Sequence, residues 1–393
     1  MSDEAPLRVV VAGGGIAAAE VVLALADVAG DRVAVTVVNP SDKLVMRPFR
    51  PGEAFSLHAR TEYPLDELVE SAGGTLVLAA VTGVDGGVGR VRLDSGEALE
   101  YDRLVLAIGS QLRNPFEQAL TFRGGRAGTA FGGLLSDIEQ GYTKSVAFVV
   151  PPGTTWPLPL YELALMTARE ARAMGVEPEL SLLTTELRPL DVFGQVGSAA
   201  VSELLAQAGV TVVTDTEVTE PEVGVFVTAG GREIDAQRVV TIPVMHGHSI
   251  PGVPADPHGF VPVDGECRVR GLANAYAAGD GSTVAIKQGG VACQQADAIA
   301  ERIAAEAGAD IDPAPVNLVL RGRLMTGSTL RYLSDTDPDG AEPEEPVLFA
   351  GHRKVDGRYL SPWIAGADGV HERDHDPVED PSAPALEVEA PAS

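Results

Sequence analysis

A glycine-rich turn between an apolar strand and an apolar helix carries the clearest chemistry in the sequence. Gly13, Gly15 and Ala18 follow the β-rich run 7–12 and open the stretch 16–29, which is rich in Ala, Leu and Val. In such a turn the first glycine permits the tight bend, and the second lets a pyrophosphate approach the backbone. The small third residue allows close packing of helix and strand. The pattern predicts a dinucleotide-binding site, whereas without this strand–helix context it would indicate only a turn.

The residues around this turn supply the other contacts that a dinucleotide needs. The backbone N–H groups of Ile16 and Ala17 would face the anion at the positive end of the helix. A second apolar strand at 32–38 completes a strand–helix–strand unit. The residue that closes this strand is usually acidic and binds ribose hydroxyls, but here it is Asn39. An amide still bonds a hydroxyl, and we expect Lys43 or Asp42 to share the role.

Two later segments extend the predicted nucleotide site. The run 105–110 (VLAIGS) ends a strand at Gly109, and the strand 273–278 is followed directly by Gly279 and Asp280. Taken alone, an Asp after a strand is better explained as a turn residue. Because the three signals follow in order along the chain, we interpret them together as parts of one flavin-nucleotide site.

With these motifs the chain resembles the FAD oxidoreductases that contain two dinucleotide-binding domains. It is most similar to the branch of sulfide:quinone oxidoreductases, flavin subunits of flavocytochrome c sulfide dehydrogenases and type II NADH dehydrogenases, and within it to actinobacterial FAD/NAD(P)-binding oxidoreductases. The resemblance spans residues 7–363. It implies FAD as the cofactor, with the positive end of a helix from about residue 290 directed at the pyrimidine side of the flavin. The cofactor-binding residues predicted in this way are Gly13, Gly15, Ile16, Ala17, Ala18, Asn39, Lys43, Arg47, Val81, Gly109, Gly279, Asp280, Gln288, Gly290 and Val291.

The second strand–helix–strand unit departs from the family pattern. If it bound NAD(P)H, its strand at 145–150 would be followed by another G-x-G-x-x-G turn. The loop 151–159 reads PPGTTWPLP instead, and prolines lack the N–H groups that would hold a pyrophosphate. The loop resembles that of the sulfide:quinone enzymes, where it carries a redox cysteine; Trp156 stands in about that place. Cys267 and Cys293 are the only cysteines and are far apart in sequence, which argues against a disulfide reductase.

No residue is identified from the sequence as a catalytic acid or base. Lys287, the lysine nearest the expected flavin, either stabilises an anionic flavin or guides a substrate, or else forms a surface salt bridge. Trp156 is either a substrate platform or, as is more common, a packing aromatic. Cys293 is either a redox thiol or, as we favour, a small buried helix residue. Arg47, in the loop after the second strand, is either a flavin or pyrophosphate contact or a simple loop charge.

Two further patterns have structural explanations that we prefer. His246 and His248 are spaced like a metal-binding pair, but no third ligand accompanies them, so no metal site is predicted. Tyr359, Trp363 and Ile364 form a short apolar patch near acidic residues. Core packing or a contact in a homodimer is the favoured explanation, ahead of peripheral membrane contact.

The composition restricts the class of protein. The 393 residues include 56 acidic and 29 basic ones, which gives a formal net charge of -27. Such a field repels nucleic acid and anionic lipid. No run approaches the roughly 18 apolar residues of a membrane helix, and the acidic stretch 1–6 shows no signal peptide. We therefore expect a cytoplasmic protein whose partner is a small-molecule or quinone substrate, or an electron-carrier protein.

The predicted chemistry requires elements that hold it, and the apolar patterns supply two sets of them. The fold is predicted to be α/β, with two Rossmann-like three-layer domains of ββα and βαβ units, of the pyridine-nucleotide-disulfide-reductase type. Helices are expected near 132–141, 160–174, 197–208 and 290–307, and a β-like stretch at 316–332. The predicted division is an FAD-binding domain of residues 1–110 and 251–325, a linker with an inserted second dinucleotide-like domain at 111–250, a small C-terminal segment at 326–367 and a disordered acidic tail at 368–393.

These observations predict an FAD-dependent oxidoreductase that passes two electrons through the flavin to a quinone or another electron carrier. It would resemble sulfide:quinone oxidoreductases while lacking their redox cysteine pair. One alternative is an NAD(P)H-dependent flavin reductase with a non-standard nicotinamide site. Another is a flavin-binding partner or sensor protein without turnover of its own.

Overall fold

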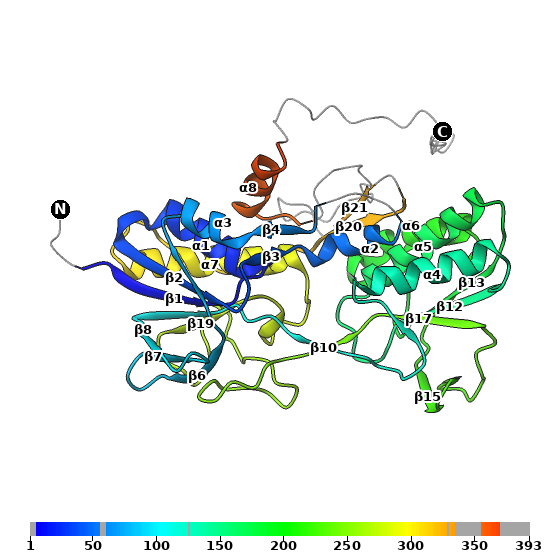
Figure 1. Ribbon diagram of the computed structural model, residues 1–393, viewed down its shortest axis with the longest axis horizontal. Helices are drawn as coiled ribbons and strands as arrows, with labels where there is room; N and C mark the ends of the chain where they lie inside the picture. Colours follow the sequence, from blue (N-terminus) through cyan, green and yellow to red (C-terminus); the bar gives the residue numbers. More distant parts are fainter. Residues whose placement is uncertain (1–4, 56–59, 125, 328–329, 335–354, 370–393) are drawn as a thin grey trace, which may run out of the picture.

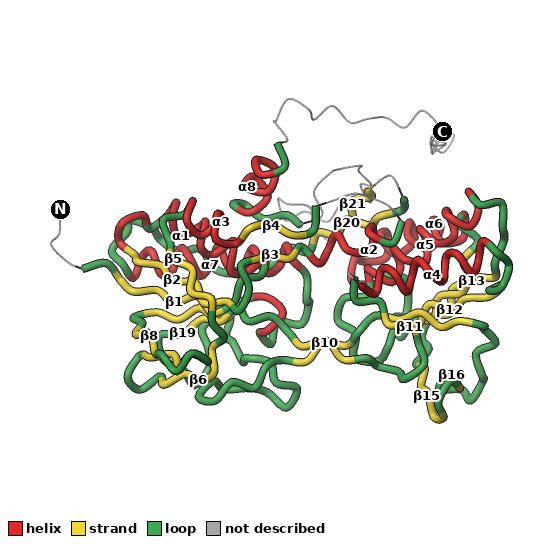
Figure 2. Tube along the Cα trace, in the orientation of Figure 1, coloured by secondary structure: helices red, strands yellow, loops and turns green. Residues whose placement is uncertain are grey.

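Two parallel sheets define the architecture. The computed structural model describes residues 5–55, 60–124, 126–327, 330–334 and 355–369. The sheets lie in two lobes side by side along the long axis of the molecule (Figure 1). We call them the first lobe, which contains β1 (Leu7–Ala12), and the second lobe, which contains β12 (Ser145–Val149). In both lobes the main helices lie on the same side of the sheet (Figure 2).

The first lobe is built on five parallel strands with β1 in the middle. The run LRVVVA of β1 is almost entirely apolar and its last four residues are buried, as expected of a strand covered on both faces. Because every pair is parallel, the carboxyl ends of the strands meet at one edge, where such sheets bind ligands. The spatial order is β19 (Ala275–Ala277), β9 (Arg103–Leu106), β1, β2 (Val33–Asn39) and β5 (Thr75–Leu78).

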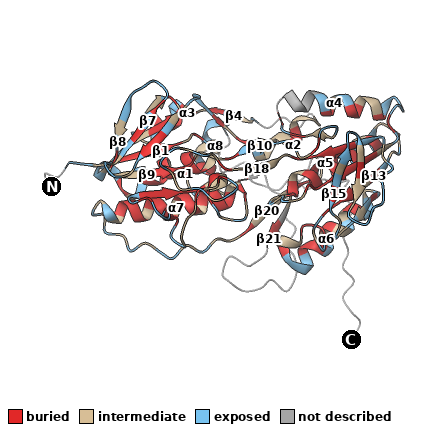
Figure 3. Ribbon diagram, turned by 90° about the horizontal axis from the view of Figure 1, so that it is seen from below, coloured by how far each residue is buried: buried red, intermediate tan, exposed pale blue. Residues whose placement is uncertain are grey.

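Helices cover one face of this sheet and a small antiparallel sheet covers the other, which gives three layers. The Ala-rich faces of α1 and α7 pack against each other, and Figure 3 shows both helices largely buried. A second core lies between the parallel and antiparallel sheets, around Val10, Val91 and Leu104. The helices are α1 (Ile16–Val28), α3 (Leu65–Ser71), α7 (Gly289–Glu306) and α8 (Leu360–Ala367), and the antiparallel strands are β6 (Val81–Asp85), β7 (Arg90–Leu93) and β8 (Ala98–Glu100).

The second lobe repeats the parallel-sheet design. Its central strand β12 is buried over Val146–Val149 and pairs in parallel on both sides. Phe148, Leu163 and Leu182 lie in the core between sheet and helices. The strands are, in spatial order, β11 (Leu120–Thr121), β17 (Arg238–Thr241), β12, β13 (Glu179–Leu183) and β14 (Val210–Val213). The helices are α4 (Arg126–Glu139), α5 (Leu158–Ala173) and α6 (Gly194–Gln207), and the hairpin β15 (Val218–Glu222) and β16 (Val225–Thr228) covers the other face.

The chain crosses between the lobes on two paired strands. Leaving the first lobe on β10 (Gln111–Arg113), it returns on β18 (Val244–His246), with Leu112 opposite Met245. On the other side of the junction lie α2 and the hairpin of β20 and β21 (Figure 1). These and the remaining elements are α2 (Arg50–Glu53), β20 (Arg321–Met325), β21 (Leu330–Ser334), β3 (Lys43–Val45), β4 (Glu62–Pro64) and the 3-10 turns η1 (Gly30–Arg32), η2 (Arg47–Phe49), η3 (Asp191–Phe193) and η4 (Gly279–Gly281).

The α/β fold predicted from the sequence is confirmed. The helices predicted at 160–174, 197–208 and 290–307 are α5, α6 and α7, and each begins one to three residues earlier than expected. The helix predicted at 132–141 begins six residues earlier, as α4, because Gly132 and Gly133 are tolerated in its interior.

The C-terminal part differs more from its prediction. Of the β-like stretch expected at 316–332, residues 321–325 form β20 and 330–332 belong to β21. The helix α8 was not predicted. Asp368, expected to begin a disordered tail, ends α8 and accepts a 2.8 Å hydrogen bond from the hydroxyl of Tyr63. The rest of that expected tail, 370–393, lies outside the described residues.

Candidate functional site

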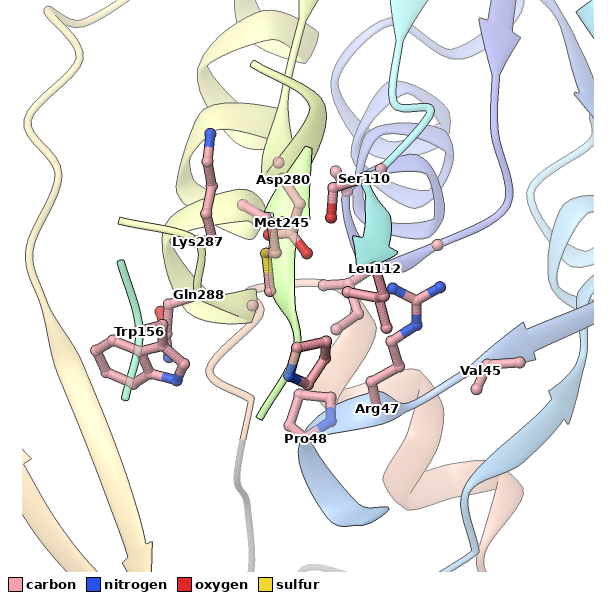
Figure 4. A pocket seen from close by; sticks show the side chains of 18 of the residues that line it. Val45, Arg47, Pro48, Ser110, Leu112, Trp156, Met245, Asp280, Lys287 and Gln288 are labelled. Atoms are coloured by element: carbon pink, nitrogen blue, oxygen red, sulfur yellow. The ribbon is translucent and has the colours of Figure 1, made fainter. Parts of the chain in front are cut away.

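A cavity of about 590 Å³ lies where the two lobes meet. Its walls come from the carboxyl ends of the first-lobe strands, from the loop before α5, and from the crossing strands β10 and β18. In Figure 4 the side chains of Arg47, Met245 and Trp156 border one space from three different elements. The cavity therefore brings together the three predicted flavin motifs of the first lobe and the proline-rich loop of the second.

The turn after β1 brings backbone close to its neighbours. Gly13 has a φ of +119°, and a Cβ there would lie 2.1 Å from the carbonyl oxygen of Ala107. A Cβ on Gly14 would lie 2.6 Å from the side chain of Asn39. Neither position accepts a side chain, and this absence allows the ends of three strands to converge on the turn.

Gly15, in contrast, faces empty space. It is the N-cap of α1 with an ordinary φ of −91°, and a Cβ built on it meets no atom within 4 Å. No side chain caps this helix, and its first turn contains no acidic residue. The N–H groups of Ile16 and Ala17 therefore have no acceptor within the helix, and both residues line the cavity. An uncapped helix end of this kind binds a phosphate group.

Asn39 and Lys43 line the cavity as predicted, but both already have a partner. The Nδ2 of Asn39 donates to the carbonyl of Ser41 at 2.7 Å, so the amide oxygen is the atom available to a ligand. The Nζ of Lys43 lies 2.7 Å from the carboxylate of Glu62 across the β3–β4 hairpin. Because Glu62 balances its charge, Lys43 is the weaker candidate for a nucleotide contact.

The ends of β9 and β19 bring polar groups without partners to the cavity. Gly109 has a φ of +65° and open space at its Cβ position. The hydroxyl of Ser110 is buried and has no hydrogen-bond partner within the described parts of the chain. Burial raises the pKa of the Asp280 carboxyl, while the charges of Lys287 and Arg47 act in the opposite direction. A hydroxyl and a carboxyl held in this way suit a ligand that carries several hydroxyl groups.

A glutamine holds the turn that presents Asp280. The Oε1 of Gln295 in α7 accepts the N–H of Gly279 at 3.0 Å, and its Nε2 contacts the sulfur of Cys267 at 3.7 Å. The methyl of Ala17 would lie only 3.2 Å from a Cβ on Gly279. Gly279, predicted as a cofactor residue, therefore lines the cavity at a point where α1 and α7 approach each other.

The start of α7 is capped by its own N-cap side chain. The Oε1 of Gln288 accepts the N–H of Val291 at 2.8 Å, and its Nε2 donates to the carbonyl of Arg321 at 3.0 Å. Gln288 lines the cavity, whereas Gly290 and Val291 do not. The N–H of Val291, predicted to contact the cofactor, is therefore already bonded within the protein.

Lys287 is held inside the first lobe. Its side chain is buried, its ammonium lies 4.1 Å from the ring centroid of Phe260, and it donates a hydrogen bond to the carbonyl of Ser282. Burial lowers the pKa of this amine to about 8, although the nearby Asp280 favours the charged form. The alternative of a surface salt bridge is wrong, because only 6% of the residue is exposed.

Three other predicted residues lie away from the cavity. Ala18 is buried in the core beside the sheet, and Val81 belongs to the small antiparallel sheet. Cys293 is completely buried; burial and the neighbouring Glu20 raise the pKa of its thiol. Burial likewise raises the pKa of the Cys267 thiol. Protonated thiols shielded from the cavity act as packing groups, the role that the sequence favoured for Cys293.

The loop before α5 is longer than a phosphate-binding turn. Eight residues, 150–157, separate β12 from α5, whereas three separate β1 from α1. Thr154 closes a turn on the carbonyl of Pro151 through its N–H at 3.2 Å and its hydroxyl at 2.7 Å. Pro157, which has no N–H, is the N-cap of α5. The second lobe therefore lacks the short glycine-rich turn that holds a pyrophosphate, and three prolines in its place offer no N–H group.

Trp156 joins this loop to two other parts of the structure. It lines the cavity, and its ring meets that of Phe193 edge-on with 5.8 Å between centroids. Phe193 in turn covers Gly322 in β20, where a Cβ would lie 2.3 Å from its ring. Trp156 is thus a packing aromatic and a part of the cavity wall at the same time.

The acidic residue that follows β13 is also bonded internally. The Oε2 of Glu186 accepts hydrogen bonds from the hydroxyl of Tyr161 at 2.6 Å and from that of Thr184 at 2.9 Å. Burial raises the pKa of this carboxyl. In a nucleotide-binding unit, the polar side chain after the second strand binds ribose hydroxyls. Here residues of the second lobe itself have taken that bonding capacity.

Several cavity residues belong to no sequence motif. Arg50, Arg123, Met245 and Phe260 all line it. Met245 lies on the crossing strand β18 and Arg123 follows β11 of the second lobe, so their position in the cavity depends on tertiary structure. The only local signal for Arg50 is its place three residues after Arg47, in the same arginine- and proline-rich loop.

The histidines near the cavity do not gather as metal ligands. His248 lines the cavity, where burial and the charge of Arg47 lower its pKa. His246 lies beside His258 instead, with 6.3 Å between ring centroids. In the ranges that the structure describes, no three His, Cys, Asp or Glu side chains are close enough to hold a metal ion.

The apolar patch near the C-terminal end packs against the first lobe. The ring of Trp363 meets that of Tyr63 edge-on at 6.1 Å, and its Nε1 donates to the hydroxyl of Ser71 at 3.3 Å. Tyr359 and Ile364 contact the same core, which confirms the core-packing explanation. Of the helices described here, none has the length and apolarity needed to cross a membrane.

Comparison with known proteins identifies the family. The family model of pyridine nucleotide-disulphide oxidoreductases matches residues 7–149 and 162–296. The chain belongs to this family. The match is interrupted at 150–161, which contains the proline-rich loop and Trp156. The segment that lacks a nicotinamide fingerprint is therefore also the segment in which this member departs from its family.

One curated relative is an NADH dehydrogenase-like protein of Mycobacterium tuberculosis. It is 29% identical over 229 residues, which cover 55% of this chain and 57% of the relative. The chain thus matches little more than half the length of that protein.

Three solved structures share the fold of this family member. The sulfide:quinone oxidoreductase of Aquifex aeolicus superposes with a TM-score of 0.77 at 20% identity, covering 92% of this chain and 89% of the other. The NDH2 of Plasmodium falciparum, solved with NADH, gives 0.67 at 11% identity, with 92% and 94% covered. The covalent putidaredoxin reductase–putidaredoxin complex gives 0.61 at 20% identity, with 84% and 82% covered.

FAD is the cofactor of the family, and the first lobe of this member fits it. The uncapped N-terminus of α1 and the empty space at Gly15 suit the pyrophosphate. The unbonded hydroxyl of Ser110 and the buried carboxyl of Asp280 suit the hydroxyls of the ribityl chain. In the second lobe, the corresponding loop 150–157 is longer and contains prolines, and Glu186 is bonded to Tyr161 and Thr184.

Proposed function

We propose that this family member is an FAD-dependent oxidoreductase whose electron donor is not NAD(P)H and whose acceptor is a quinone or another electron carrier. The observation that carries the proposal is the loop 150–157, which stands where a nicotinamide-binding turn would be. Bound FAD supplies the two-electron chemistry, and the chain supplies position and electrostatics.

The first lobe binds and orients the nucleotide in this account. The N–H groups of Ile16 and Ala17 hold the pyrophosphate, and Asn39 bonds a ribose hydroxyl. Asp280 accepts hydrogen bonds from the ribityl hydroxyls. The ammonium of Lys287, fixed on Phe260 and Ser282, places a positive charge beside the cavity and so favours added negative charge there.

The second lobe contributes a wall rather than a nucleotide site. Pro151 and Pro152 offer no N–H, and Thr154 is bonded to the loop itself. Glu186 is occupied by Tyr161. A nicotinamide nucleotide would have to replace these internal bonds without gaining the donors that hold its phosphates. This supports a donor other than NAD(P)H.

The apolar part of the cavity wall is suited to a flat, apolar electron acceptor. Phe122, Leu158 and Met245 line the cavity together with Trp156. Aromatic and aliphatic walls of this kind bind planar apolar molecules and exclude water. The Aquifex enzyme of the same fold has a quinone named as its acceptor, which favours this class for the family member described here.

A second candidate function is an NAD(P)H-dependent reductase. The name of the mycobacterial relative and the NADH complex of the Plasmodium enzyme favour it. It requires NAD(P)H to bind without the usual turn, and it predicts rapid reduction of the flavin by NADH. The loop and the occupied Glu186 make it the weaker candidate.

The acceptor half of the proposal is tested by reoxidation of the flavin. FAD-loaded protein is reduced anaerobically with one equivalent of dithionite and mixed with duroquinone in a stopped-flow spectrometer. We expect the visible flavin band to return with a rate that saturates in quinone concentration. Trp156→Ala should raise the half-saturating concentration several-fold, whereas Trp363→Ala, on the outer side of the first lobe, should not. Reoxidation no faster than in buffer would refute a quinone acceptor.

A further inference from the structure

The cavity has the opposite sign of charge from the rest of the protein. The whole chain has a net charge of -27, yet Asp280 is the only carboxylate among the described residues that line the cavity. The charge of one basic lining residue, Lys43, is balanced by its ion pair with Glu62. The six basic lining residues are Lys43, Arg47, Arg50, Arg123, Lys287 and Arg323.

Arg50 has one buried charged donor, its Nε, without an acceptor among the described residues. It begins α2, and its aliphatic stem lies against Gly124, where a Cβ would meet the Cδ of Arg50 at 2.2 Å. Its Nε is buried and has no hydrogen-bond partner in the described chain. Its Nη1 donates a long hydrogen bond, 3.5 Å, to the carbonyl of Arg123. A buried donor in this state is costly unless a ligand supplies the missing acceptor.

Arg123 contributes a second guanidinium to the lining of the same cavity. Its Nη1 donates to the carbonyl of Leu112 at 3.0 Å, and its Nε and Nη2 donate to the amide oxygen of Asn114 at 3.1 and 2.7 Å. These acceptors are neutral, so they fix the orientation of the guanidinium without cancelling its charge. Some of its five N–H groups remain for a ligand.

Both arginines stand at the second-lobe end of the cavity, away from the glycine-rich turn. The element that carries Arg50, α2, contacts α4 and α5 of the second lobe. Arg123 directly follows Phe122, and Phe122, Leu158 and Trp156 also line the cavity. A paired positive site therefore lies next to an apolar wall.

We propose that Arg50 and Arg123 form an anion-binding site that takes the carboxylate of a second substrate whose body is apolar. Guanidinium groups bind carboxylates through parallel, charge-assisted hydrogen bonds, and the apolar wall holds the remainder of the molecule. The site deepens the proposed function, since it assumes that FAD occupies the first-lobe end of the same cavity. The ligand class is an aromatic or similarly apolar carboxylate.

The test compares a carboxylate with its neutral analogue. FAD-loaded, oxidised protein is titrated with 2-naphthoate and separately with 2-naphthamide, and binding is followed by the visible flavin spectrum and tryptophan fluorescence. We expect naphthoate to bind about tenfold more tightly than the amide. Arg50→Gln and Arg123→Gln should each remove most of that difference. Arg113→Gln, an exposed position on β10 that does not line the cavity, should leave it unchanged.

Three results would overturn the proposal. The first is equal affinity for the two probes in the unmodified protein, and the second is no binding of naphthoate at all. The third is loss of FAD from Arg50→Gln and Arg123→Gln, because the arginines would then serve the phosphates of the cofactor. The readout involves no electron transfer, so a failure of the quinone test would leave this proposal standing, and the reverse is also true.

Discussion

The hydroxyl of Tyr161 donates a 2.6 Å hydrogen bond to the carboxylate of Glu186, across the space between the first turns of α5 and the end of β13. This bond holds the side chain that follows the second strand of the nucleotide-type sheet inside the second lobe. The parallel sheet is intact, but the side chain that would meet a ribose is bonded inside the lobe. The loop 150–157 removes the phosphate contacts in the same region.

Loss of the Tyr161 hydroxyl should destabilise the second lobe. Tyr161→Phe leaves the partly buried Glu186 without one of its donors, so we expect a loss of about 1–3 kcal/mol in the free energy of unfolding. Urea denaturation measures this. Tyr142→Phe is the matched control, because Tyr142 is 73% exposed and should change stability little. Equal stability of the two variants would show that the hydrogen bond does not contribute to the free energy of unfolding.

The glycines of the first turn should separate folding from cofactor binding. Gly13→Ala forces a Cβ against the carbonyl of Ala107 at a positive φ, so we expect a clear fall in melting temperature. Gly15→Ala meets no protein atom and should fold normally. Its methyl group enters the space assigned to the pyrophosphate, so FAD affinity should fall at least about tenfold. Absorbance of the purified protein gives the FAD content, and a Gly15→Ala variant that retains FAD fully would contradict the assignment.

The motifs predicted the first lobe far better than the junction between lobes. Gly13, Gly15 and Asp280 were predictable because their roles depend on local turns after strands, which sequence spacing records. Met245 was not predictable, since it reaches the cavity through the pairing of two crossing strands. Arg123 was not predictable either, since its guanidinium is positioned by hydrogen bonds to Leu112 and Asn114. Val291 shows a third situation: the helix was predicted correctly, but the side chain of Gln288 bonds the N–H that the prediction assigned to the cofactor.

A buried pair of carboxyls links α8 to the first lobe. Glu20 in α1 is completely buried, and its two oxygens accept the N–H groups of Tyr359 and Leu360 at 2.8 and 2.7 Å. Burial and the neighbouring Glu20 raise the pKa of Asp297 to about 8. Asp297 therefore holds a proton at neutral pH while Glu20 caps the start of α8.

This pair predicts a pH dependence of stability with a defined sign. Unfolded Asp297 ionises near pH 4 and folded Asp297 near pH 8, so the folded state binds the extra proton between these values. Stability should fall as the pH rises through this window. Asp297→Asn should flatten the dependence and raise stability at pH 8 by about 1–2 kcal/mol, allowing for partial exposure. Asp310→Asn, at an exposed site, is the control and should keep the pH dependence of the unmodified protein. Thermal melts of the three proteins from pH 5 to 9 measure the difference.

The amine of Lys287 should be visible in the redox behaviour of the bound flavin. With a pKa of about 8, it loses its positive charge as the pH rises past that value. In the unmodified protein, we expect the flavin midpoint potential to fall steeply with pH around that value. In Lys287→Met the potential should be lower at neutral pH and should fall less steeply. Lys144→Met, at an exposed position, should follow the unmodified protein. Identical profiles for the Lys287 variant and the unmodified protein would place this amine too far away to act.

The most direct test of the account is an anaerobic titration of the FAD-loaded protein with NADH and then NADPH, recorded in the visible flavin band. We propose that the loop 150–157 and the bonded Glu186 stand in place of a nicotinamide site. We therefore predict that the band persists with an excess of either nucleotide and disappears only when dithionite is added. Bleaching within seconds of adding NADH or NADPH would contradict the account and show that the second lobe delivers a hydride despite its prolines.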